Sequence, residues 1–290
     1  MVNEEIIGLV YAVAALFSFG LSPLFYKIGM KNNLHVLEAN TIRSWGALAL
    51  LTPILIIYRV SPCIPWELVM FVIFSALAGP IIGDTFFLFS IKKVGASVAT
   101  PLVSTYSLMV AIMSVMLFGE KLTVLNILGG FLILSSVWLV YLERRNLGDE
   151  SILGLIACLG AALGYALSII SMNYLLNSEV DPVAIIYLRT LLVGIMLTLL
   201  TKVLNLNINF LSKNRGTLVI LSIGGFFGIG FGVIMMLNAI TYLGAGKASF
   251  IASASPVVST SLAITLLREK FRVRIVLAAI LVFIGATMLK

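Results

Sequence analysis

Three charged residues lie inside apolar stretches long enough to cross a membrane: Arg43, Asp84 and Arg189. A charge near the middle of a bilayer costs at least about 2.5 to 3.5 kcal/mol on insertion scales, so each one needs a partner or a function. A buried carboxylate can take up and release a proton, and the planar guanidinium group suits carboxylates and phosphates. These residues are therefore the first candidates for chemistry in this chain.

Arg43 and Asp84 are expected at the same depth in the membrane. If their spans cover about 38–58 and 67–91, each residue lies roughly 7.5 Å from the centre of its span, toward the same face, at 1.5 Å per residue. We therefore predict an intramembrane ion pair in which Arg43 keeps Asp84 ionised. Three roles stay open for Asp84: a structural ion pair, a proton-coupling site, or direct contact with a substrate.

Arg189 repeats Arg43 at an offset of 146 residues, but Val233 stands where an offset of 149 would place the match of Asp84. One interpretation is that Arg189 binds a carboxylate or phosphate group of a substrate. The alternative is structural: Arg189 caps carbonyl groups at a helix end or reaches Glu120, which is expected on the same membrane face.

Uncharged polar side chains are further candidates for a cavity lining. Ser104-Thr105-Tyr106 is matched in the repeat by Ser253-Ala254-Ser255, which places hydroxyl groups at corresponding depths. Each hydroxyl could also bond a carbonyl of its own helix, so their clustering carries the argument. The predicted substrate-binding or cavity residues are Ser18, Asp84, Thr85, Ser104, Tyr106, Tyr165, Ser168, Asn173, Arg189, Asn238, Ser253 and Ser255. Aromatic residues that could receive an apolar part of a substrate, or simply face lipid, include Phe19, Phe86, Phe87 and Phe250.

The composition places all these residues in a membrane protein. The chain is 61% hydrophobic and 11% charged, with a mean hydropathy of +1.14, whereas soluble domains carry about 25% charged residues. A span needs roughly 20 apolar residues. Uncharged stretches of suitable length cover 6–26, 94–119, 122–142, 151–178, 216–246 and 248–267, and four more stretches, short or with one internal charge, cover about 37–58, 67–91, 182–201 and 273–289. We predict an all-α, multi-pass integral protein of the cell membrane with ten transmembrane helices.

The sequence also repeats itself. The shift of 146 superimposes Gly8 on Gly154 and Ser22 on Ser168, and the shift of 149 superimposes Gly79 on Gly228 and Glu120 on Glu269. Because each copy holds five spans, the second copy enters the bilayer from the opposite side, as in many secondary transporters. We predict two inverted five-helix repeats, 1–147 and 148–290. Small residues at intervals of four predict close helix crossings at Ser75-xxx-Gly79-xxx-Gly83 and Gly224-xxx-Gly228-xxx-Gly232.

Several other function classes lack the residues they need. The chain has one histidine, His35, and no HExxH or GxSxG motif, which argues against an enzyme. Cys63 and Cys158 are isolated, so we expect no disulfide, metal site or cofactor. The formal charge of +7 suits anionic lipid headgroups, but no basic stripe indicates nucleic acid. Most Lys and Arg residues fall in the odd-numbered loops, which by the positive-inside rule would place both termini outside the cell.

These motifs resemble the ten-span EamA-type members of the drug/metabolite transporter superfamily. The resemblance covers nearly the whole chain and rests on Gly83-Asp84-Thr85-Phe86-Phe87, on the stretch from Val94 to Leu102, on Gly119-Glu120-Lys121-Leu122, and on the second copies Gly244-Ala245, Ser255-Pro256-Val257-Val258 and Arg268-Glu269-Lys270. It implies export or exchange of small metabolites, often amino acids, through a cavity lined by spans one, three, four, six, eight and nine. It also implies that both termini lie in the cytoplasm, against the charge count.

The functional prediction is a secondary transporter that moves amino acids or related small organic solutes by alternating access through a central cavity, with a proton as a possible coupling ion. The alternatives are a passive facilitator or channel, and a carrier of the multidrug or sugar-phosphate type. The expected partners are a small-molecule substrate and the lipid bilayer.

Overall fold

The computed structural model describes residues 2–29, 34–94, 99, 102–144, 152–206, 214–267 and 273–289, and every regular element within them is a helix. The motif segments 95–98, 100–101 and 268–272, which include Glu269, lie outside the described residues. The helices are α1 (Val2–Gly29), α2 (Val36–Ile57), α3 (Trp66–Ala76), η2 (Leu77–Gly83), α4 (Asp84–Val94), α6 (Tyr106–Phe118), α7 (Val124–Arg144), α8 (Ile152–Asn177), α9 (Pro182–Val203), α10 (Arg215–Gly225), η4 (Phe226–Phe231), α11 (Gly232–Leu243), α12 (Ala245–Ala252), α13 (Ser255–Leu267) and α14 (Val273–Thr287).

Six helical stretches are long and apolar enough to cross a membrane. They cover Glu4–Tyr26, Val36–Ile57, Trp66–Ile91, Ile152–Asn177, Pro182–Val203 and Arg215–Leu243. The third and sixth of these are continuous runs of three elements, α3-η2-α4 and α10-η4-α11. The shorter apolar helices include Tyr106–Phe118 and Val124–Leu139. The predicted all-helical membrane protein is thus present, with six clear candidate spans among the described residues.

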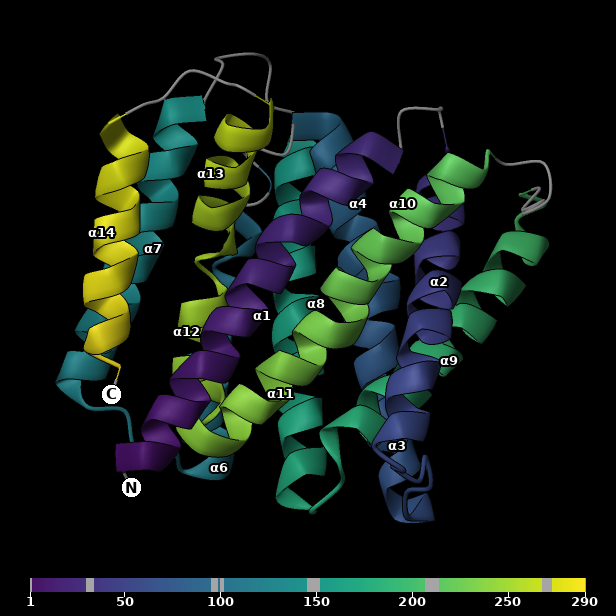
Figure 1. The fold of residues 1–290 in the computed structure, drawn as a ribbon, viewed down its shortest axis with the longest axis horizontal. Helices are drawn as coiled ribbons and strands as arrows, with labels where there is room; N and C mark the ends of the chain where they lie inside the picture. Colours follow the sequence, from purple (N-terminus) through teal and green to yellow (C-terminus); the bar gives the residue numbers. More distant parts are fainter. Residues whose placement is uncertain are drawn as a thin grey trace.

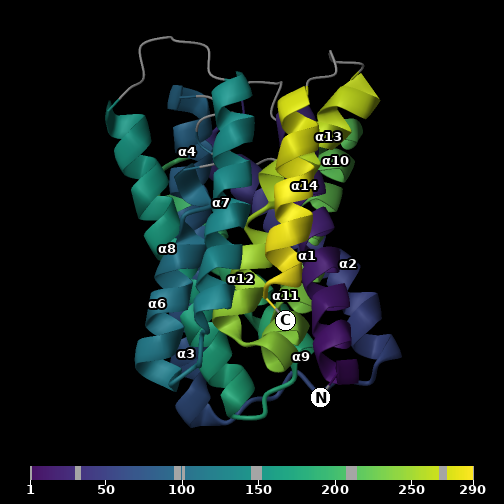
Figure 2. The ribbon, with the colours of Figure 1, turned by 90° about the vertical axis from the view of Figure 1, so that its left-hand side faces the viewer.

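The helices run between two edges of the molecule, and in Figure 1 the N-terminus lies near the lower edge and the C-terminus higher up, in the lower half. α1 rises from this edge, whereas α8, its counterpart 146 residues later, descends toward it (Figure 1). α7 and α14 lie side by side at one end of the bundle (Figure 2). A Cβ atom on Gly129 of α7 would lie 2.7 Å from the carbonyl oxygen of Gly285 in α14, so these two backbones approach closely.

Two long helical runs are interrupted by π-helix at matching places. η2 begins at Leu77 and η4 at Phe226, which are 149 residues apart. Helix is broken again by turns at 104–105 and at 253–254, with the same offset. Such π-helical turns occur frequently at functional sites because they shift backbone hydrogen bonds. The interruptions therefore mark where the interior of the bundle departs from regular packing.

The predicted glycine crossings are present in the structure. A Cβ atom on Gly79 would lie 2.6 Å from the hydroxyl oxygen of Ser168 in α8. A Cβ atom on Gly228 would lie 2.5 Å from the hydroxyl oxygen of Tyr26 in α1. Because Gly79 and Gly228 leave this space free, η2 packs directly on α8 and η4 directly on α1.

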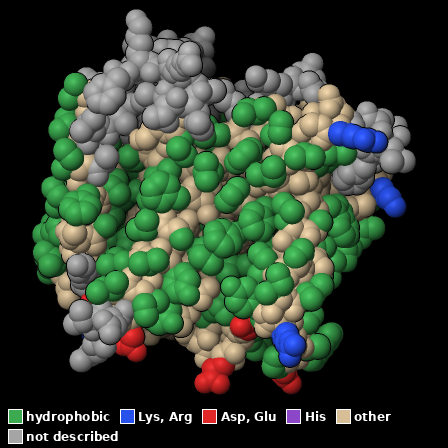
Figure 3. Space-filling model, in the orientation of Figure 1, with side chains coloured by type: hydrophobic (Ala, Val, Ile, Leu, Met, Phe, Trp, Pro, Cys, Tyr) green, Lys and Arg blue, Asp and Glu red, His purple; other side chains and the backbone are tan. Residues whose placement is uncertain are grey.

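The surface matches a protein surrounded by lipid. In Figure 3, hydrophobic side chains cover the middle of the visible face, and acidic side chains gather along its lower edge. Large apolar residues such as Leu159 (57% exposed) and Phe283 (73% exposed) point outward. Exposed apolar area on this scale is unfavourable in water and favourable in a bilayer.

Candidate functional site

A cavity of about 160 Å³ lies in the interior, at the level of the π-helical turns. Its walls come from α1, α2, η2, α4, residues 103–106, α8, α9, η4, α11 and α13. The described lining includes no residue of α7 or α14. Relative to the cavity implied by the family resemblance, α2 and α9 are additional walls, contributing Arg43 and Arg189.

The lining residues of the two halves correspond to one another. The offset of 146 relates Phe19 to Tyr165, Ser22 to Ser168, Pro23 to Ile169, Tyr26 to Met172 and Arg43 to Arg189. The offset of 149 relates Pro80 to Ile229, Asp84 to Val233, Phe87 to Met236 and Tyr106 to Ser255. Each half therefore contributes matching positions to one shared cavity.

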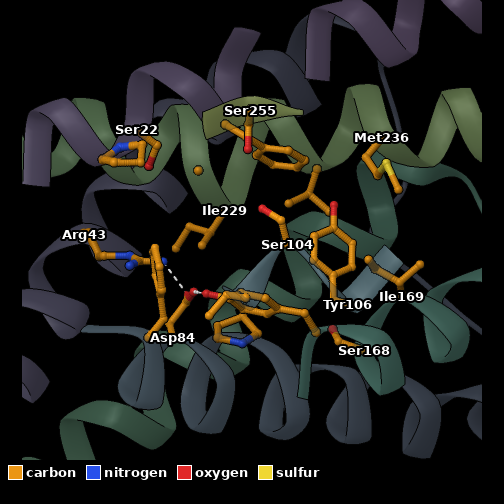
Figure 4. A pocket seen from close by; sticks show the side chains of 18 of the residues that line it. Ser22, Arg43, Asp84, Ser104, Tyr106, Ser168, Ile169, Ile229, Met236 and Ser255 are labelled. Atoms are coloured by element: carbon orange, nitrogen blue, oxygen red, sulfur yellow. Dashed lines mark hydrogen bonds and ion pairs between the residues drawn. The ribbon is translucent and has the colours of Figure 1, made fainter. Parts of the chain in front are cut away.

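Asp84 is the centre of a hydrogen-bonded cluster on one side of the cavity (Figure 4). Its Oδ2 forms an ion pair with Nη2 of Arg43, and its Oδ1 accepts a hydrogen bond of 2.5 Å from the hydroxyl of Tyr165. The guanidinium of Arg43 also lies 4.5 Å above the ring centre of Tyr26, within range of a cation–π contact. Arg43 is 2% exposed. Four helices contribute to this cluster, in which one buried positive charge on α2 balances one buried negative charge on α4.

Serine hydroxyls bond the carbonyl groups that precede the π-helical turns. Ser22 and Tyr26 both donate to the carbonyl oxygen of Gly224, at 2.9 and 2.8 Å. Ser168 donates to the carbonyl oxygen of Ser75 at 2.9 Å. Ser75 and Gly224 are again 149 residues apart, so the same bond occurs once in each direction between the halves. These bonds satisfy backbone groups in a region where the regular helix pattern is disturbed.

Arg189 has a different environment from Arg43. It is 5% exposed and donates one hydrogen bond of 3.2 Å from Nη2 to the hydroxyl oxygen of Ser168. Within the described part of the chain, its Nε and Nη1 atoms have no hydrogen-bond partner. Val233, at the position that matches Asp84, also lines the cavity but carries no charge. Nε and Nη1 of Arg43 also lack hydrogen-bond partners among the described residues. The two arginines differ instead in charge compensation, because Arg43 has an ion pair with Asp84.

Glu120 does not play the role considered for it as a partner of Arg189. Its carboxylate accepts hydrogen bonds from the backbone N–H groups of Ala245 at 2.7 Å and Gly246 at 3.1 Å. The helix that this carboxylate caps is α12, which belongs to the other half of the chain. The contact is favourable because the first turn of α12 has free N–H groups and a positive dipole end.

The structure places seven of the predicted site residues in the cavity lining: Asp84, Ser104, Tyr106, Tyr165, Ser168, Arg189 and Ser255. The other five predicted positions are outside the lining: Ser18, Thr85, Asn173, Asn238 and Ser253. Asn238 and Ser253 each donate to a carbonyl of their own helical run, those of Ile234 at 2.9 Å and Phe250 at 2.7 Å. Ser18 is buried where α1 packs near Gly232. The hydroxyl of Thr85 is buried with no hydrogen-bond partner among the described residues.

Several lining residues were not among the predicted site residues. Ser22 and Tyr26 of α1 form the bonds to Gly224, and Met172, Ile229 and Met236 supply apolar wall. The repeat contained the signal for Ser22, because it aligns with Ser168, a predicted site residue. Met172 aligns with Tyr26, but a methionine and a tyrosine share no property that would predict that both line the cavity.

Known proteins share both the sequence pattern and the fold. The EamA-like transporter family matches residues 6–142 and again residues 152–290. The chain belongs to this family. A relative described as an uncharacterized transporter, from Archaeoglobus fulgidus, is 26% identical over 282 residues, covering 96% of this chain and 95% of the relative. A crystal structure with 16% identity superimposes with a TM-score of 0.78 over 97% of this chain and 95% of the other, which shows a shared fold.

Membership identifies the chain as a multi-pass integral membrane protein of a transporter family. The predicted drug/metabolite transporter resemblance is confirmed by the double match. General transport of a small solute across a lipid bilayer follows from the family, which is one of transporters and not of enzymes.

Proposed function

We propose that this EamA-family protein is a secondary transporter with ten transmembrane helices, built as two inverted five-helix repeats over 1–147 and 148–290. It moves amino acids or related small organic solutes, by export or exchange, through alternating access to the central cavity. The double family match and the opposite directions of α1 and α8 support this arrangement. Inverted repeats allow the two halves to exchange conformations around a fixed site.

The observation that carries the proposal is the shared cavity. Matching positions of both halves line it, and it lies where both π-helical turns interrupt their helices. The paired bonds from Ser22 to Gly224 and from Ser168 to Ser75 join one half to the other at symmetry-related points. Alternating access requires two conformations of similar energy, one with the cavity open to each side of the membrane. Two halves with matching contacts can provide such a pair, because each half can adopt the conformation of the other.

The cavity also favours a carrier over a passive channel. A channel needs a continuous pore lined by rings of like charge or by backbone carbonyls. The lining described here is asymmetric in charge and mostly apolar, with aromatic and aliphatic walls. A carrier of the multidrug or sugar-phosphate type remains the alternative within the same transport mechanism.

Counterflow in proteoliposomes tests the proposal. Purified protein is reconstituted, loaded with an unlabelled solute, and supplied with the same solute in labelled form outside. A carrier accumulates label transiently and saturates with concentration, for at least one class among amino acids, organic anions, organic cations and sugar phosphates. Linear uptake without counterflow would indicate a channel, and no uptake in any class would contradict solute transport.

Proton coupling is part of the proposal and centres on Asp84. To take up a proton, this carboxylate must weaken its contacts to Arg43 and Tyr165, which would loosen the junction between α2, α4 and α8. In wild-type protein that shows counterflow, an imposed pH gradient should then change the rate of solute transport. Asp84→Asn should abolish this effect of the pH gradient, with solute binding still measurable. A pH-gradient response that is unchanged in Asp84→Asn would exclude Asp84 from coupling.

A further inference from the structure

We infer that the preferred solute is a small organic monoanion with an apolar body, held by Arg189, in preference to a zwitterion such as an amino acid. This inference rests on the proposed transport function and, within its class of small organic solutes, favours organic acids without an amine over amino acids. It follows from the balance of charge in the cavity, from the free donors of Arg189, and from the size and character of the walls.

The charges of the described lining do not cancel. Its charged residues are Arg43, Asp84 and Arg189, which amount to one carboxylate for two guanidinium groups. Asp84 is committed to Arg43 by a direct ion pair. Arg189 therefore leaves one positive charge uncompensated inside a low-dielectric interior, where an unpaired charge is unfavourable. A bound monoanion restores neutrality.

Arg189 has the donors that such an anion requires. Its Nη2 contacts the hydroxyl of Ser168, whereas Nε and Nη1 are buried without a partner among the described residues. The hydroxyl of Ser168 donates its own proton to the carbonyl of Ser75, which fixes its position beside the guanidinium. Charge-assisted hydrogen bonds from a guanidinium to a carboxylate are among the strongest polar contacts in proteins.

The cavity offers poor accommodation for an ammonium group. Both oxygens of Asp84 are already engaged, Oδ2 by Arg43 and Oδ1 by Tyr165. An ammonium near this carboxylate would also lie beside the positive charge of Arg43. The repulsion between like charges is strong in a site shielded from water. A solute with a carboxylate and no amine avoids this cost.

The walls define the remainder of the solute. Phe87, Ile169, Ile229 and Met236 are apolar and line the same cavity as Arg189. In the view of Figure 4, Ile169 and Met236 lie on the same side of the cavity as Tyr106, and Ile229 appears on the side of Arg43. The volume of about 160 Å³ is close to that of an engineered 150 Å³ cavity that binds benzene. A ring or short branched chain bearing one carboxylate fits this description.

An isosteric series of ligands tests the inference. Benzoate, benzamide and benzamidinium share one shape and carry charges of −1, 0 and +1, and phenylglycine adds the zwitterion. Ligand-induced thermal stabilisation of the detergent-purified full chain is measured across a concentration series. We expect an apparent Kd for benzoate at least tenfold lower than for benzamide or phenylglycine, and no stabilisation by benzamidinium. Equal affinity across the series, or no response to benzoate, would overturn the inference.

Variants assign the preference to Arg189. Arg189→Gln should reduce the benzoate-to-benzamide preference to less than about threefold, whereas Arg59→Gln, at an exposed position outside the cavity, should leave it unchanged. If Arg189→Gln elutes as aggregate, Val233→Asp is the second variant and should lose benzoate binding in the same way. A preference that survives in both folded variants would contradict the role of Arg189. Saturable counterflow of any solute class would show that transport stands even where this anion preference fails.

Discussion

Arg43 and Arg189 occupy matching positions in the two halves and have different electrostatic surroundings. Arg43 has a carboxylate partner and an aromatic ring beneath it, supplied by Asp84 and Tyr26. In the second half, Val233 stands at the position of Asp84 and Met172 at the position of Tyr26, and both line the same cavity as Arg189. The backbone framework is duplicated, but one side of the cavity is electrically balanced and the other is not.

This difference separates the features that determine helix packing from the features that determine which solute binds. The features that both halves keep are the glycine crossings, the π-helical turns and the serine-to-carbonyl bonds, all of which concern how helices pack. The feature that differs is the compensation of a buried charge. In a cavity with approximate twofold symmetry, a solute with one charged end has one preferred orientation only where the symmetry is broken.

The largest expected effect comes from making the first half resemble the second. Asp84→Val leaves Arg43 as an uncompensated buried charge, and breaking a buried ion pair by removing one partner costs about 3–5 kcal/mol. We expect a strongly lowered thermal unfolding temperature in detergent, or loss of folded protein. The double variant Arg43→Met/Asp84→Val is the matched control, because it removes both charges and should recover most of the stability. Equal stability of wild type and Asp84→Val would show that the ion pair contributes little.

The next effect comes from making the second half resemble the first. Val233→Asp places a carboxylate at the position that matches Asp84, from which the repeat predicts that it pairs with Arg189 as Asp84 pairs with Arg43. We expect transport of organic anions to fall at least tenfold in counterflow, while the thermal stability is kept or increased, since the unpaired charge gains a partner. Val233→Asn has nearly the same shape without the charge and should retain most anion transport. A similar decrease of anion transport in Val233→Asp and Val233→Asn would indicate a steric effect in place of charge compensation.

The duplicated framework predicts equal responses at equivalent glycines. Gly79→Ala and Gly228→Ala each insert a methyl group where hydroxyl groups of the facing helix stand, those of Ser168 and Tyr26. Overpacking of this kind costs about 1–3 kcal/mol. Both variants should therefore lower the unfolding temperature by similar amounts, whereas Gly216→Ala, at an exposed position in the first turn of α10, should not. A lowered unfolding temperature in only one of the two variants would show that the side-chain packing is less symmetric than the backbone.

The same contrast explains how much of the molecule could be predicted from its sequence. The meeting of Arg43 and Asp84 followed from the fixed rise per residue in a helix, which sets depth, and the crossings at Gly79 and Gly228 followed from the spacing of small residues. The contribution of Tyr26 could not be derived, because it depends on which face of α1 turns inward. The π-helical turns also lack a common sequence cause, since η2 contains Pro80 and η4 contains no proline.

The smallest expected effect concerns a contact between the two halves that lies outside the cavity. Glu120 caps the first turn of α12 through the N–H groups of Ala245 and Gly246. Glu120→Gln keeps an acceptor but removes the charge that favours the helix dipole, an effect of about 0.3–1 kcal/mol. The unfolding temperature of Glu120→Gln should fall slightly. The control variant Glu179→Gln, at an exposed position in the turn before α9, should have the unfolding temperature of the wild type. Because the contact lies outside the cavity lining, the ligand preference should not change in Glu120→Gln, and an altered preference would show that this end of the bundle is coupled to the site.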